Sequence, residues 1–514
     1  MIISHKHKFI FFKTRKTAGS SIQVALAKHC GSDDIVTGQY RDGIDDNSQS
    51  AGLNMDRFYT NHPHPEIVPT KMFIEQNFGK EVWDSYFKFG FIRNPYEIVV
   101  SRYFWERRGK GGTIEDCSIE DFKEFTKKEL LEYEHDWLHP YIAINDKIEL
   151  DFIGKYETLQ DDFKFICQKL NLPNTELPFK KGGFREKKHY STYYDDETKD
   201  VVKNFFKKDI ELFGYNFNSE FYVNKFGPII TQDMLKNNLG DNINGPSVIK
   251  VPEWIENPLG KYYLYFAHHD GKFIRMAYSD DMRGPWKIYH DGTLKLEDSA
   301  CEDHIASPDV HVDNKNKRII MYYHGVTKSS DAPHNQCSFT SFSKNGLDFI
   351  SKSRILGMFY FRVFEYNNKF YAIAKNKNID GILYESEDGL SDFKPVFNLI
   401  PNMRHCATWV NNDYLYVFYT AVGDTPESIM MYKIKLDKDI EKWEIVDTEY
   451  ILKPEFDWEG GNLPLQPSKF GASLWPVNEV RDPCIFEDDD NLYLLYTIAG
   501  EFGVALSKLY KVRN

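Results

Sequence analysis

The first half of the chain alternates short apolar runs with helical patterns. Residues 9–12 form a continuous apolar run, as expected for a buried strand, and a helical pattern begins soon afterwards, near Ser20. A second apolar run, residues 86–92, also precedes a helical pattern, over residues 96–105. Strands that alternate with helices in this way predict an α/β domain, a parallel sheet flanked by helices.

From about residue 244 onward the pattern changes to a repeated unit of short strands. Each unit has an apolar strand, a turn and an aromatic-rich strand, and most continue into a further strand. The unit recurs about every 45–75 residues, and its first strands start near residues 245, 307, 361, 405 and 482. Five such units predict an all-β, five-bladed propeller.

The two patterns divide the chain into two domains. Residues 1–222 form the predicted α/β domain, and residues 244–514 form the predicted propeller. The stretch between them, residues 223–243, follows neither pattern and is predicted to be a linker. A chain of 514 residues is long enough to bury two separate cores.

The turn between the first apolar run and the first helix is a candidate anion-binding site. Residues 13–21 read Lys-Thr-Arg-Lys-Thr-Ala-Gly-Ser-Ser. A tight turn from strand to helix presents free backbone N–H groups and the positive end of the helix dipole, and Lys16 adds a full charge. The turn therefore predicts a phosphate site. A kinase or NTPase is disfavoured, because the motif Gly-x-x-x-x-Gly-Lys-Ser/Thr needs its lysine after a glycine and Lys16 precedes Gly19.

A second candidate anion-binding element follows the second apolar run. Arg93 comes directly after that run and can bind a phosphate with two parallel hydrogen bonds. Pro95 suits the first turn of a helix, where its missing N–H is not needed. Ser101 lies two helical turns further on and can face the same pocket.

Together the two elements resemble the sulfotransferases that use 3′-phosphoadenosine 5′-phosphosulfate (PAPS), in the branch that acts on carbohydrates. The turn is similar to their loop Pro-Lys-Thr-Gly-Gly-Thr-Ser, with Arg15 where proline is common and Ala18 where glycine is common. The second element resembles their Arg-x-Pro and Ser-x-Tyr pattern, and the resemblance covers about residues 1–222.

The resemblance implies which residues hold the nucleotide. The first loop of that family holds the 5′-phosphosulfate, and the second element holds the 3′-phosphate. The implied nucleotide-binding residues are Lys13, Arg15, Lys16, Thr17, Ala18, Gly19, Ser20, Ser21, Arg93, Ser101, Lys188 and Tyr190. Lys188 belongs to a basic stretch that is equally compatible with solvated surface charge.

Sulfuryl transfer also needs a base for the acceptor hydroxyl, and histidine suits this role because its ordinary pKa lies near neutrality. The resemblance places a histidine between the two phosphate elements, where this chain has Asn-His-Pro-His-Pro over residues 61–65. His62 is the expected base and His64 is the alternative. Lys16 is expected to neutralise charge on the departing phosphate. PAPS is the expected co-substrate, and the chemistry requires no metal.

The repeated units resemble the arabinanase, xylosidase and invertase-like glycosidases, five-bladed propellers whose carboxylates project into a central channel. A glycosidase needs two carboxyl groups about 5–9.5 Å apart with separated pKa values, and Asp309, Glu365 and Asp482 could supply them. The aspartate that usually opens the first blade is absent, because this chain has Gly-Pro-Ser over residues 245–247. The channel candidates are Asp309, Arg362, Glu365, Arg404, His405, Arg481 and Asp482, with His268, His269, Asp270 and His304 nearby.

Composition narrows the choice of partners. The net charge is −13 and neither half is basic, so the chain lacks the field of a nucleic-acid binder. Seven cysteines without metal-ligand spacing suggest free thiols in a reducing compartment. No signal-peptide layout and no apolar stretch of about 20 residues is present, so we expect a cytoplasmic protein without a membrane span.

The sequence thus predicts a PAPS-dependent sulfotransferase that acts on a carbohydrate hydroxyl and carries a propeller that binds or trims the glycan. One alternative is a glycoside hydrolase that works through the propeller, with a nucleotide-binding accessory domain. Another is a propeller that only binds glycans or is purely structural. The oligomeric state is left open.

Overall fold

The computed structural model describes the chain except for residues 38–53, 55–57, 61–63, 110–117, 133–138, 146, 174–176, 178–188, 218, 236–241, 328, 331, 378 and 512–514. The chain divides into two compact units. Met1–Tyr222 belongs to the first unit and Val223–Tyr510 forms the second.

The first unit is built on a five-stranded sheet in the order β3-β1-β2-β4-β7. Its strands are β1 (Ile2–Ser4), β2 (Phe9–Phe12), β3 (Ile35–Val36), β4 (Phe87–Ile92) and β7 (Phe152–Lys155). The three strands β2, β4 and β7 are parallel, whereas β1 is antiparallel to both β2 and β3. The predicted α/β fold is confirmed, with a mixed sheet rather than a purely parallel one. The difference arises because β1 and β2 are joined by a short turn, which permits only antiparallel pairing.

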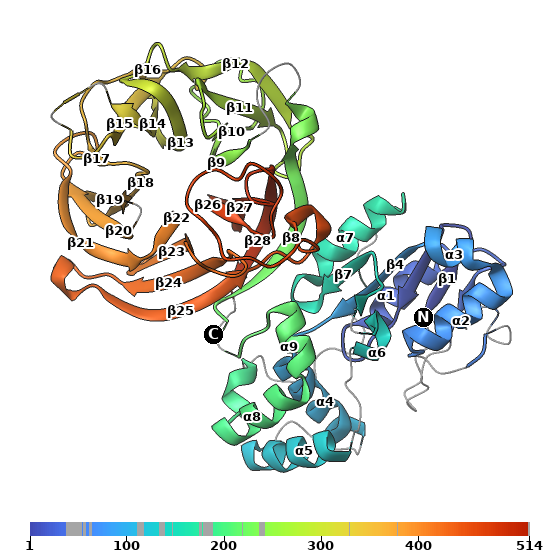
Figure 1. The fold of residues 1–514 in the computed structure, drawn as a ribbon. Helices are drawn as coiled ribbons and strands as arrows, with labels where there is room; N and C mark the ends of the chain where they lie inside the picture. The colour runs from blue at the N-terminus through green and yellow to red at the C-terminus, as the bar shows by residue number, and fades with distance from the viewer. Residues whose placement is uncertain are drawn as a thin grey trace. The chain divides into compact units, whose positions relative to one another are not determined.

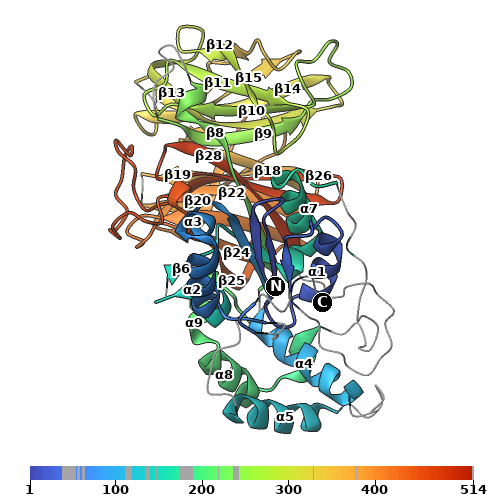
Figure 2. The same ribbon diagram turned by 90° about the vertical axis from the view of Figure 1, so that its right-hand side faces the viewer.

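Helices cover both faces of this sheet (Figure 2). Side chains alternate along each strand, so Phe9 and Phe11 face α1 (Gly19–Ala27) and α7 (Leu159–Lys169). Ile10 and Phe12 face the opposite side, where the core includes α2 (Ile67–Phe78), α3 (Lys80–Ser85) and α4 (Pro95–Gly109). Strands buried on both faces read as continuous apolar runs, which is why the first run was visible in the sequence.

Smaller elements complete the first unit. They are α5 (Ile119–Glu132), α6 (His139–Ile142), β5 (Ala143–Ile144), β6 (Lys147–Ile148), η2 (Tyr156–Thr158), η3 (Tyr190–Tyr193), α8 (Asp196–Phe205) and α9 (Lys207–Phe213). Helix α5 packs against α4 and α8. Among the helices in the described part of the chain, none is both long and apolar enough to cross a membrane.

The second unit is a five-bladed propeller, as the repeat predicts (Figure 1). The first blade contains β9 (Asn244–Lys250), β10 (Tyr262–Ala267), β11 (Phe273–Ser279) and β12 (Lys287–Lys295). The second contains β13 (Cys301–Asp313), β14 (Arg318–Thr327), β15 (Gln336–Ser343), β16 (Ile350–Ser351) and β17 (Gly357–Met358). The third contains β18 (Arg362–Tyr366), β19 (Lys369–Asn376), β20 (Asp380–Ser386) and β21 (Lys394–Pro401). The fourth contains β22 (Met403–Asn411), β23 (Tyr414–Ala421), β24 (Ile429–Lys435) and β25 (Glu444–Leu452).

The fifth blade joins two distant parts of the chain. Its first three strands are β26 (Arg481–Asp488), β27 (Asn491–Thr497) and β28 (Gly503–Lys511), and its outermost strand is β8 (Phe221–Thr231). Strand β8 and the turn η4 (Gln232–Met234) therefore occupy much of the stretch expected to be a linker. The ring is closed by pairing the start of the unit with its end.

The inner strands β9, β13, β18, β22 and β26 surround the central channel (Figure 1). Apolar clusters fill the spaces between neighbouring blades, and Tyr263, Tyr265 and Met276 are examples from the first blade. Aromatic residues on the second strands thus hold the blades together, while side chains at the ends of the inner strands are left to line the channel.

Candidate functional site

The carboxyl ends of β2 and β4 lie next to each other in the first unit. The two strands are parallel neighbours, with Phe12 opposite Gly90. The turn at residues 13–18 leads from β2 into α1, and Arg93 with Asn94 leads from β4 into α4. Ligands of open α/β sheets bind at this edge, so both predicted anion-binding elements meet at one place.

The turn after β2 is fixed in an unusual backbone conformation. Lys16 and Ala18 both have positive φ angles, 60° and 62°. The buried hydroxyl of Thr14 donates to the carbonyl of Phe91 in β4, and it also lies 2.7 Å from the hydroxyl of Thr17. These bonds tie the turn to the neighbouring strand. Left-handed residues within a tight turn are typical of backbone nests that bind anions.

The start of α1 is crowded by the buried side chain of Lys13. A Cβ atom on Gly19 would lie 2.6 Å from Cγ of Lys13, so only glycine fits there. Ala18 precedes the helix and provides no side-chain cap to its first N–H groups. Ser20 and Ser21 follow in the first turn, the former half-buried and the latter buried. The turn thus brings hydroxyls, a lysine and uncapped amides to one point.

Arg93 is held from three directions and keeps one nitrogen unused. Its Nη1 donates to the carbonyl of Lys16 at 3.0 Å, and its Nη2 donates to Oε1 of Glu97 at 3.1 Å. The guanidinium carbon lies 3.7 Å from the centre of the Tyr156 ring. Nε of Arg93 is buried and has no hydrogen-bond partner among the described residues. A buried, unsatisfied donor is costly, and a bound anion would satisfy it.

One face of α4 joins the two elements. Glu97, Ser101 and Trp105 are spaced four residues apart and therefore lie along the same face of the helix. Glu97 contacts Arg93, and the Trp105 ring centre lies 5.0 Å from Nζ of Lys16. Ser101 lies between these two contacts, on the face that looks toward both predicted anion-binding elements.

Asn94 anchors the second element. Its backbone N–H donates to Oε1 of Glu157 at 2.6 Å, and its side-chain oxygen accepts from the N–H of Tyr96 at 2.9 Å. Its amide nitrogen reaches the hydroxyls of Tyr190, at 3.3 Å, and Tyr222, at 3.2 Å. Burial raises the pKa of Glu157. Tyr190 is thereby placed beside the residue that follows Arg93.

Four contacting residues were not singled out from the sequence. They are Asn94, Glu97, Trp105 and Tyr156. Glu97 and Trp105 could have been found from the spacing of four residues on the predicted helix, since both share a face with Ser101. Tyr156 gave no local signal, because only the pairing of β4 with β7 brings it to Arg93.

His64 packs against the turn. Its Nδ1–H donates to the carbonyl of Lys13 at 2.7 Å, which leaves Nε2 as the nitrogen with the lone pair. Burial lowers the pKa of His64 to about 3, and nearby positive charges add to this effect. His64 is therefore neutral at physiological pH.

Three further residues were predicted from the sequence to belong to the nucleotide site or to act as the base. His62 and Lys188 lie outside the described residues. Arg15 lies beside Tyr141: burial raises the pKa of this tyrosine, and Arg15 opposes the rise. In the described part of the chain no group of three or more His, Cys, Asp or Glu side chains is arranged to hold a metal ion.

The propeller channel contains a cavity of about 710 Å³. Every inner strand contributes to its wall, and examples are Ser247, Asp309, Arg362, Thr408 and Pro483. Oδ2 of Asp309 lies 2.9 Å from Nε2 of His311 and accepts from the amide of Val363 at 2.8 Å. Burial alone would raise the pKa of Asp309, but these partners hold it below its ordinary value.

One residue expected in the channel lies elsewhere: Glu365 is exposed and does not line the cavity. Gly245 stands at the position where the sequence lacks the usual aspartate. It has a φ of 56°, and a Cβ there would lie 2.7 Å from Cα of Ser307. The backbone at that point therefore excludes an aspartate.

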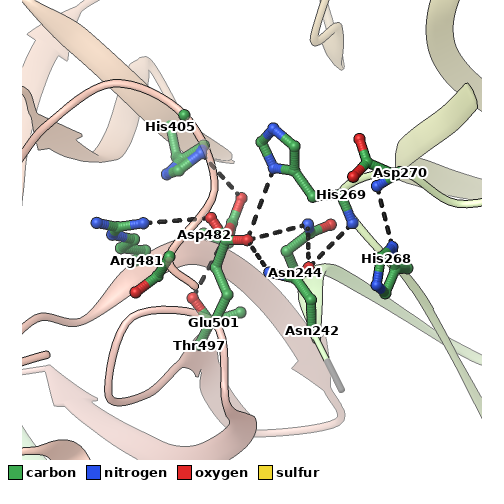
Figure 3. A network of polar contacts seen from close by, with 12 residues as sticks. Asn242, Asn244, His268, His269, Asp270, His405, Arg481, Asp482, Thr497 and Glu501 are labelled. Atoms are coloured by element: carbon green, nitrogen blue, oxygen red, sulfur yellow. Dashed lines mark hydrogen bonds and ion pairs between the residues drawn. The ribbon is translucent and has the colours of Figure 1, made fainter. Parts of the chain in front are cut away.

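Three predicted channel residues, His405, Arg481 and Asp482, meet in a second, more polar cluster (Figure 3). Asp482 is buried, and its Oδ1 lies 3.3 Å from both Nε2 of His405 and the hydroxyl of Tyr360. Burial and the charge of Glu501 raise the pKa of Asp482 to about 6. The φ of Asp482 is 45°, so the carboxylate is held by a constrained backbone.

Glu501 lies beside Asp482 and has many partners (Figure 3). It accepts from Nη1 of Arg481 at 3.2 Å and from the side-chain amides of Asn242 and Asn244, the latter at 3.5 Å. Nδ1 of His269 lies 3.6 Å away. Burial alone would raise the pKa of Glu501, but these contacts bring it down to about 2.

The remaining arginines of the cluster are paired. Nε of Arg481 lies 3.1 Å from Glu427, and its Nη2 contacts Glu479. Nη1 of Arg404 lies 3.4 Å from Glu427. Burial and the neighbouring Glu427 keep the pKa of Glu479 above its ordinary value, although Arg481 lowers it. These three carboxylates, including Glu501, neutralise the two arginines.

The outlying candidates lie at the edge of the cluster. Nδ1 of His268 accepts from the amide of Asp270 at 3.0 Å (Figure 3). Nδ1 of His304 lies 3.5 Å from Asp303. Burial lowers the pKa of both histidines.

Comparison with known proteins gives a family match for the first part of the chain. Residues 1–216 match the sulfotransferase family. An uncharacterized protein, R118, of Acanthamoeba polyphaga mimivirus is 36% identical over 308 residues, which is 52% of this chain and 84% of that protein. An uncharacterized protein of Archaeoglobus fulgidus is 32% identical over 109 residues, 20% of this chain and 80% of that protein.

Among solved structures, a thermostable family-43 glycoside hydrolase is similar to 54% of this chain and 92% of its own, with 15% identity and a TM-score of 0.38. The match of the first 216 residues and the similarity to the viral protein together show the family of this chain. It belongs to the sulfotransferase family through residues 1–216, and it shares its family with protein R118 of the mimivirus.

Proposed function

We propose that the protein transfers a sulfuryl group from PAPS to a hydroxyl of a carbohydrate. The observation that carries this proposal is the position of Arg93. A buried guanidinium with an unsatisfied nitrogen lies beside the carbonyl of Lys16, at the adjacent ends of two parallel strands. A phosphate-bearing ligand would satisfy both elements together.

The two elements divide the nucleotide between them. Residues 13–21 hold the 5′-phosphosulfate with backbone amides, Lys13, Lys16 and the hydroxyls of the turn. Arg93 and Ser101 hold the 3′-phosphate, and Tyr190, which is bonded to the neighbouring Asn94, is the further residue proposed to contact the nucleotide. Distinct pockets for two phosphates would distinguish PAPS from nucleotides without a 3′-phosphate.

The acceptor hydroxyl attacks sulfur, the bond from sulfur to the phosphate oxygen breaks, and the hydroxyl proton passes to a base. Lys16 neutralises the charge that develops on the departing phosphate oxygen. His62 is the proposed base. His64 is the poorer candidate, since a nitrogen with a pKa of about 3 has little affinity for a proton.

A second candidate function is glycoside hydrolysis in the propeller channel. It is favoured by Asp482 and Glu501, two neighbouring carboxyl groups whose pKa values are pushed apart, to about 6 and about 2. Such a separation is typical of an acid and its partner carboxylate. Release of sugar from an oligosaccharide by the wild type, and its loss in Asp482→Asn with sulfuryl transfer intact, would establish this activity.

The nucleotide site is tested by calorimetric titration with 3′-phosphoadenosine 5′-phosphate. We expect micromolar binding by the wild type and a loss of at least 100-fold in Arg93→Ala, because the guanidinium charge and a charge-assisted hydrogen bond from its buried Nε are removed. Ser101→Ala should weaken binding by about 10-fold, the effect of one hydrogen bond to a charged group.

Arg107→Ala is the matched control. Arg107 is on the same helix and forms an ion pair with Asp121, away from the two strand ends. The affinity of Arg107→Ala for 3′-phosphoadenosine 5′-phosphate should equal that of the wild type. Absence of binding by a well-folded wild type would reject PAPS as the co-substrate, and equal binding by Arg93→Ala would reject the proposed 3′-phosphate site.

A further inference from the structure

Tyr360 is the centre of a group of polar side chains contributed by four blades. It precedes β18, is buried and has a φ of 69°. Its ring centre lies 4.1 Å from the guanidinium carbon of Arg362 and 4.9 Å from Nζ of Lys375. The rings of His405 and His324 lie 5.3 Å and 6.2 Å from it. The hydroxyl of Tyr360 meets Asp482, the only carboxylate among the side chains named around it.

The two cations beside Tyr360 differ from the other cations of the channel. Arg404 and Arg481 are neutralised by Glu427, Glu479 and Glu501. Among the described residues, no carboxylate lies within ion-pair distance of Arg362 or Lys375.

Arg362 and Lys375 also keep donors unused. Nη1 of Arg362 donates to the carbonyls of Ser307 and Phe361, but its Nη2, although buried, has no partner in the described part of the chain. Lys375 is half-buried, and among the described residues its ammonium has no ion-pair partner and lies over the rings of Phe359 and Tyr360. The guanidinium of Arg362 and the ammonium of Lys375 thus both lie over the Tyr360 ring, and neither forms an ion pair with a described carboxylate.

The pKa values of the two neighbouring histidines are lowered in part by the positive charges around Tyr360. Burial lowers the pKa of His405 most, and the charge of Lys375 is the next cause. Burial likewise lowers the pKa of His324, and Lys375 and Arg362 contribute. Both imidazoles are therefore neutral. Nδ1 of His324 is buried and has no hydrogen-bond partner among the described residues, so it can donate to a ligand.

We propose that the group formed by Arg362, Lys375 and His324 around Tyr360 is a binding site for a sulfate ester carried by a sugar. Guanidinium, ammonium and imidazole N–H groups match the several oxygens of a tetrahedral oxyanion. Asp309 and Asp482 lie near enough for their charges to act on Arg362, although neither forms an ion pair with it. A sulfate ester carries one negative charge, whereas a phosphate monoester or inorganic sulfate carries about two, so the ester brings the least additional negative charge to these carboxylates.

The surroundings fit a sugar better than a free ion. The long connection between β25 and β26 contacts the polar cluster at Arg404, whose side chain donates to the carbonyls of Lys469 and Gly471. The same connection exposes Phe470, Leu474 and Trp475, which are 59%, 78% and 64% accessible. Exposed aromatic side chains beside a group of polar anchors are a common way to bind a sugar ring.

The site is independent of the nucleotide site, so the two can fail separately. The test uses the full-length protein carrying Arg93→Ala, which removes the proposed 3′-phosphate contact. The probe is galactose 6-sulfate, titrated calorimetrically beside galactose, galactose 6-phosphate and inorganic sulfate. We expect the sulfated sugar to bind at least 10-fold more tightly than galactose or the sugar phosphate.

Lys375→Met removes the charge but keeps the length of the side chain. It should weaken binding of the sulfated sugar at least 10-fold without lowering the melting temperature, because Lys375 has no ion pair to lose. Lys433→Met is the control, since Nζ of Lys433 also lies over two tyrosine rings, 4.8 Å from that of Tyr414, on the third strand of its blade. Lys433→Met should bind galactose 6-sulfate as tightly as the protein that carries Arg93→Ala alone.

Two outcomes would overturn the proposal. Equal binding of galactose and galactose 6-sulfate would show that the sulfate is not recognised. Unchanged binding in Lys375→Met would show that it is recognised elsewhere. Inorganic sulfate that binds as tightly as the ester, and is lost in Lys375→Met, would support the oxyanion site but overturn the preference for a sulfate carried by a sugar.

Discussion

Buried arginines serve two different purposes in this protein. Arg481 contacts three carboxylates, and its charge is used up within the fold. Arg93 and Arg362 each keep a buried nitrogen without a partner in the described residues. Because an unsatisfied buried donor is destabilising, such nitrogens point to ligands that complete the site. The two arginines mark one candidate site in each unit.

The identity of the base can be tested by the pH dependence of kcat/KM. With His62 as base, kcat/KM should fall as the pH drops below about 6.5, because the active form is the unprotonated imidazole. His62→Gln should then abolish transfer while nucleotide binding persists, and His64→Gln should leave the fall in place. His64 is neutral down to about pH 3, so a profile without a fall between pH 7 and pH 5 would move the role from His62 to His64.

The raised pKa of Asp482 predicts how the stability of the propeller depends on pH. Burial raises its pKa to about 6 in the folded protein, whereas the ordinary value in an unfolded chain is about 3.9. The folded state therefore binds more protons between about pH 4 and pH 6, and the free energy of unfolding falls as the pH rises through this window. Asp482→Asn removes the buried charge and should raise the melting temperature of the propeller by a few degrees at pH 8.

At pH 4 the same variant should show no gain, because the wild-type carboxyl is then protonated when folded. Thermal melts at the two pH values provide the comparison. A variant that is less stable at pH 8 would show that the ionised carboxylate stabilises the fold, contrary to the raised pKa.

Residues next to a strand end could be recognised from the sequence, and others could not. Lys16 and Arg93 follow apolar runs directly, so their location at the edge of the sheet could be predicted from the local pattern. Lys375 lies inside a second strand with no motif around it. The pairing of β19 with β18 brings it to Tyr360, since the amide of Lys375 donates to the carbonyl of Phe359. The sequence predicts this hairpin, but not that the Lys375 side chain turns toward the Tyr360 ring.

At the scale of elements, β8 shows how a strand escapes prediction. Its sequence contains Gly227, with a φ of 109°, and Pro228, both of which interrupt a strand pattern. Both are tolerated because β8 is the edge strand of the fifth blade, where one side of the backbone needs no partner. The aromatic second strands contain no proline and only one glycine, Gly325 near the end of β14, and the five blades could therefore be predicted from the sequence.

The closing role of β8 can be tested with fragments. A fragment of residues 221–514 should unfold cooperatively. A fragment of residues 244–514 lacks β8, leaves β28 as an exposed edge and should melt at a lower temperature or aggregate. Circular dichroism during heating measures both. Equal melting temperatures would mean that the ring closes without β8 and that the boundary near residue 244 is sufficient.

At the scale of the whole molecule, the chain combines an α/β unit of the sulfotransferase family with a propeller whose channel is lined by charged side chains. The fold class of both units could be predicted, because hydrophobic periodicity and a repeat depend on local sequence. The strand that closes the ring depends on pairing between distant segments, which periodicity does not encode, whereas the mixed sheet depends on the short turn that joins β1 to β2. Net charge was useful only for exclusion, since the anion sites are local.

The most direct test of the account is transfer of sulfur-35 from labelled PAPS to a panel of oligosaccharides. The wild type is expected to label at least one saccharide and to form an equal amount of 3′-phosphoadenosine 5′-phosphate. Arg93→Ala should label none under the same conditions, and Arg107→Ala should match the wild type. A folded wild type that binds the nucleotide yet labels no saccharide would contradict the proposed function.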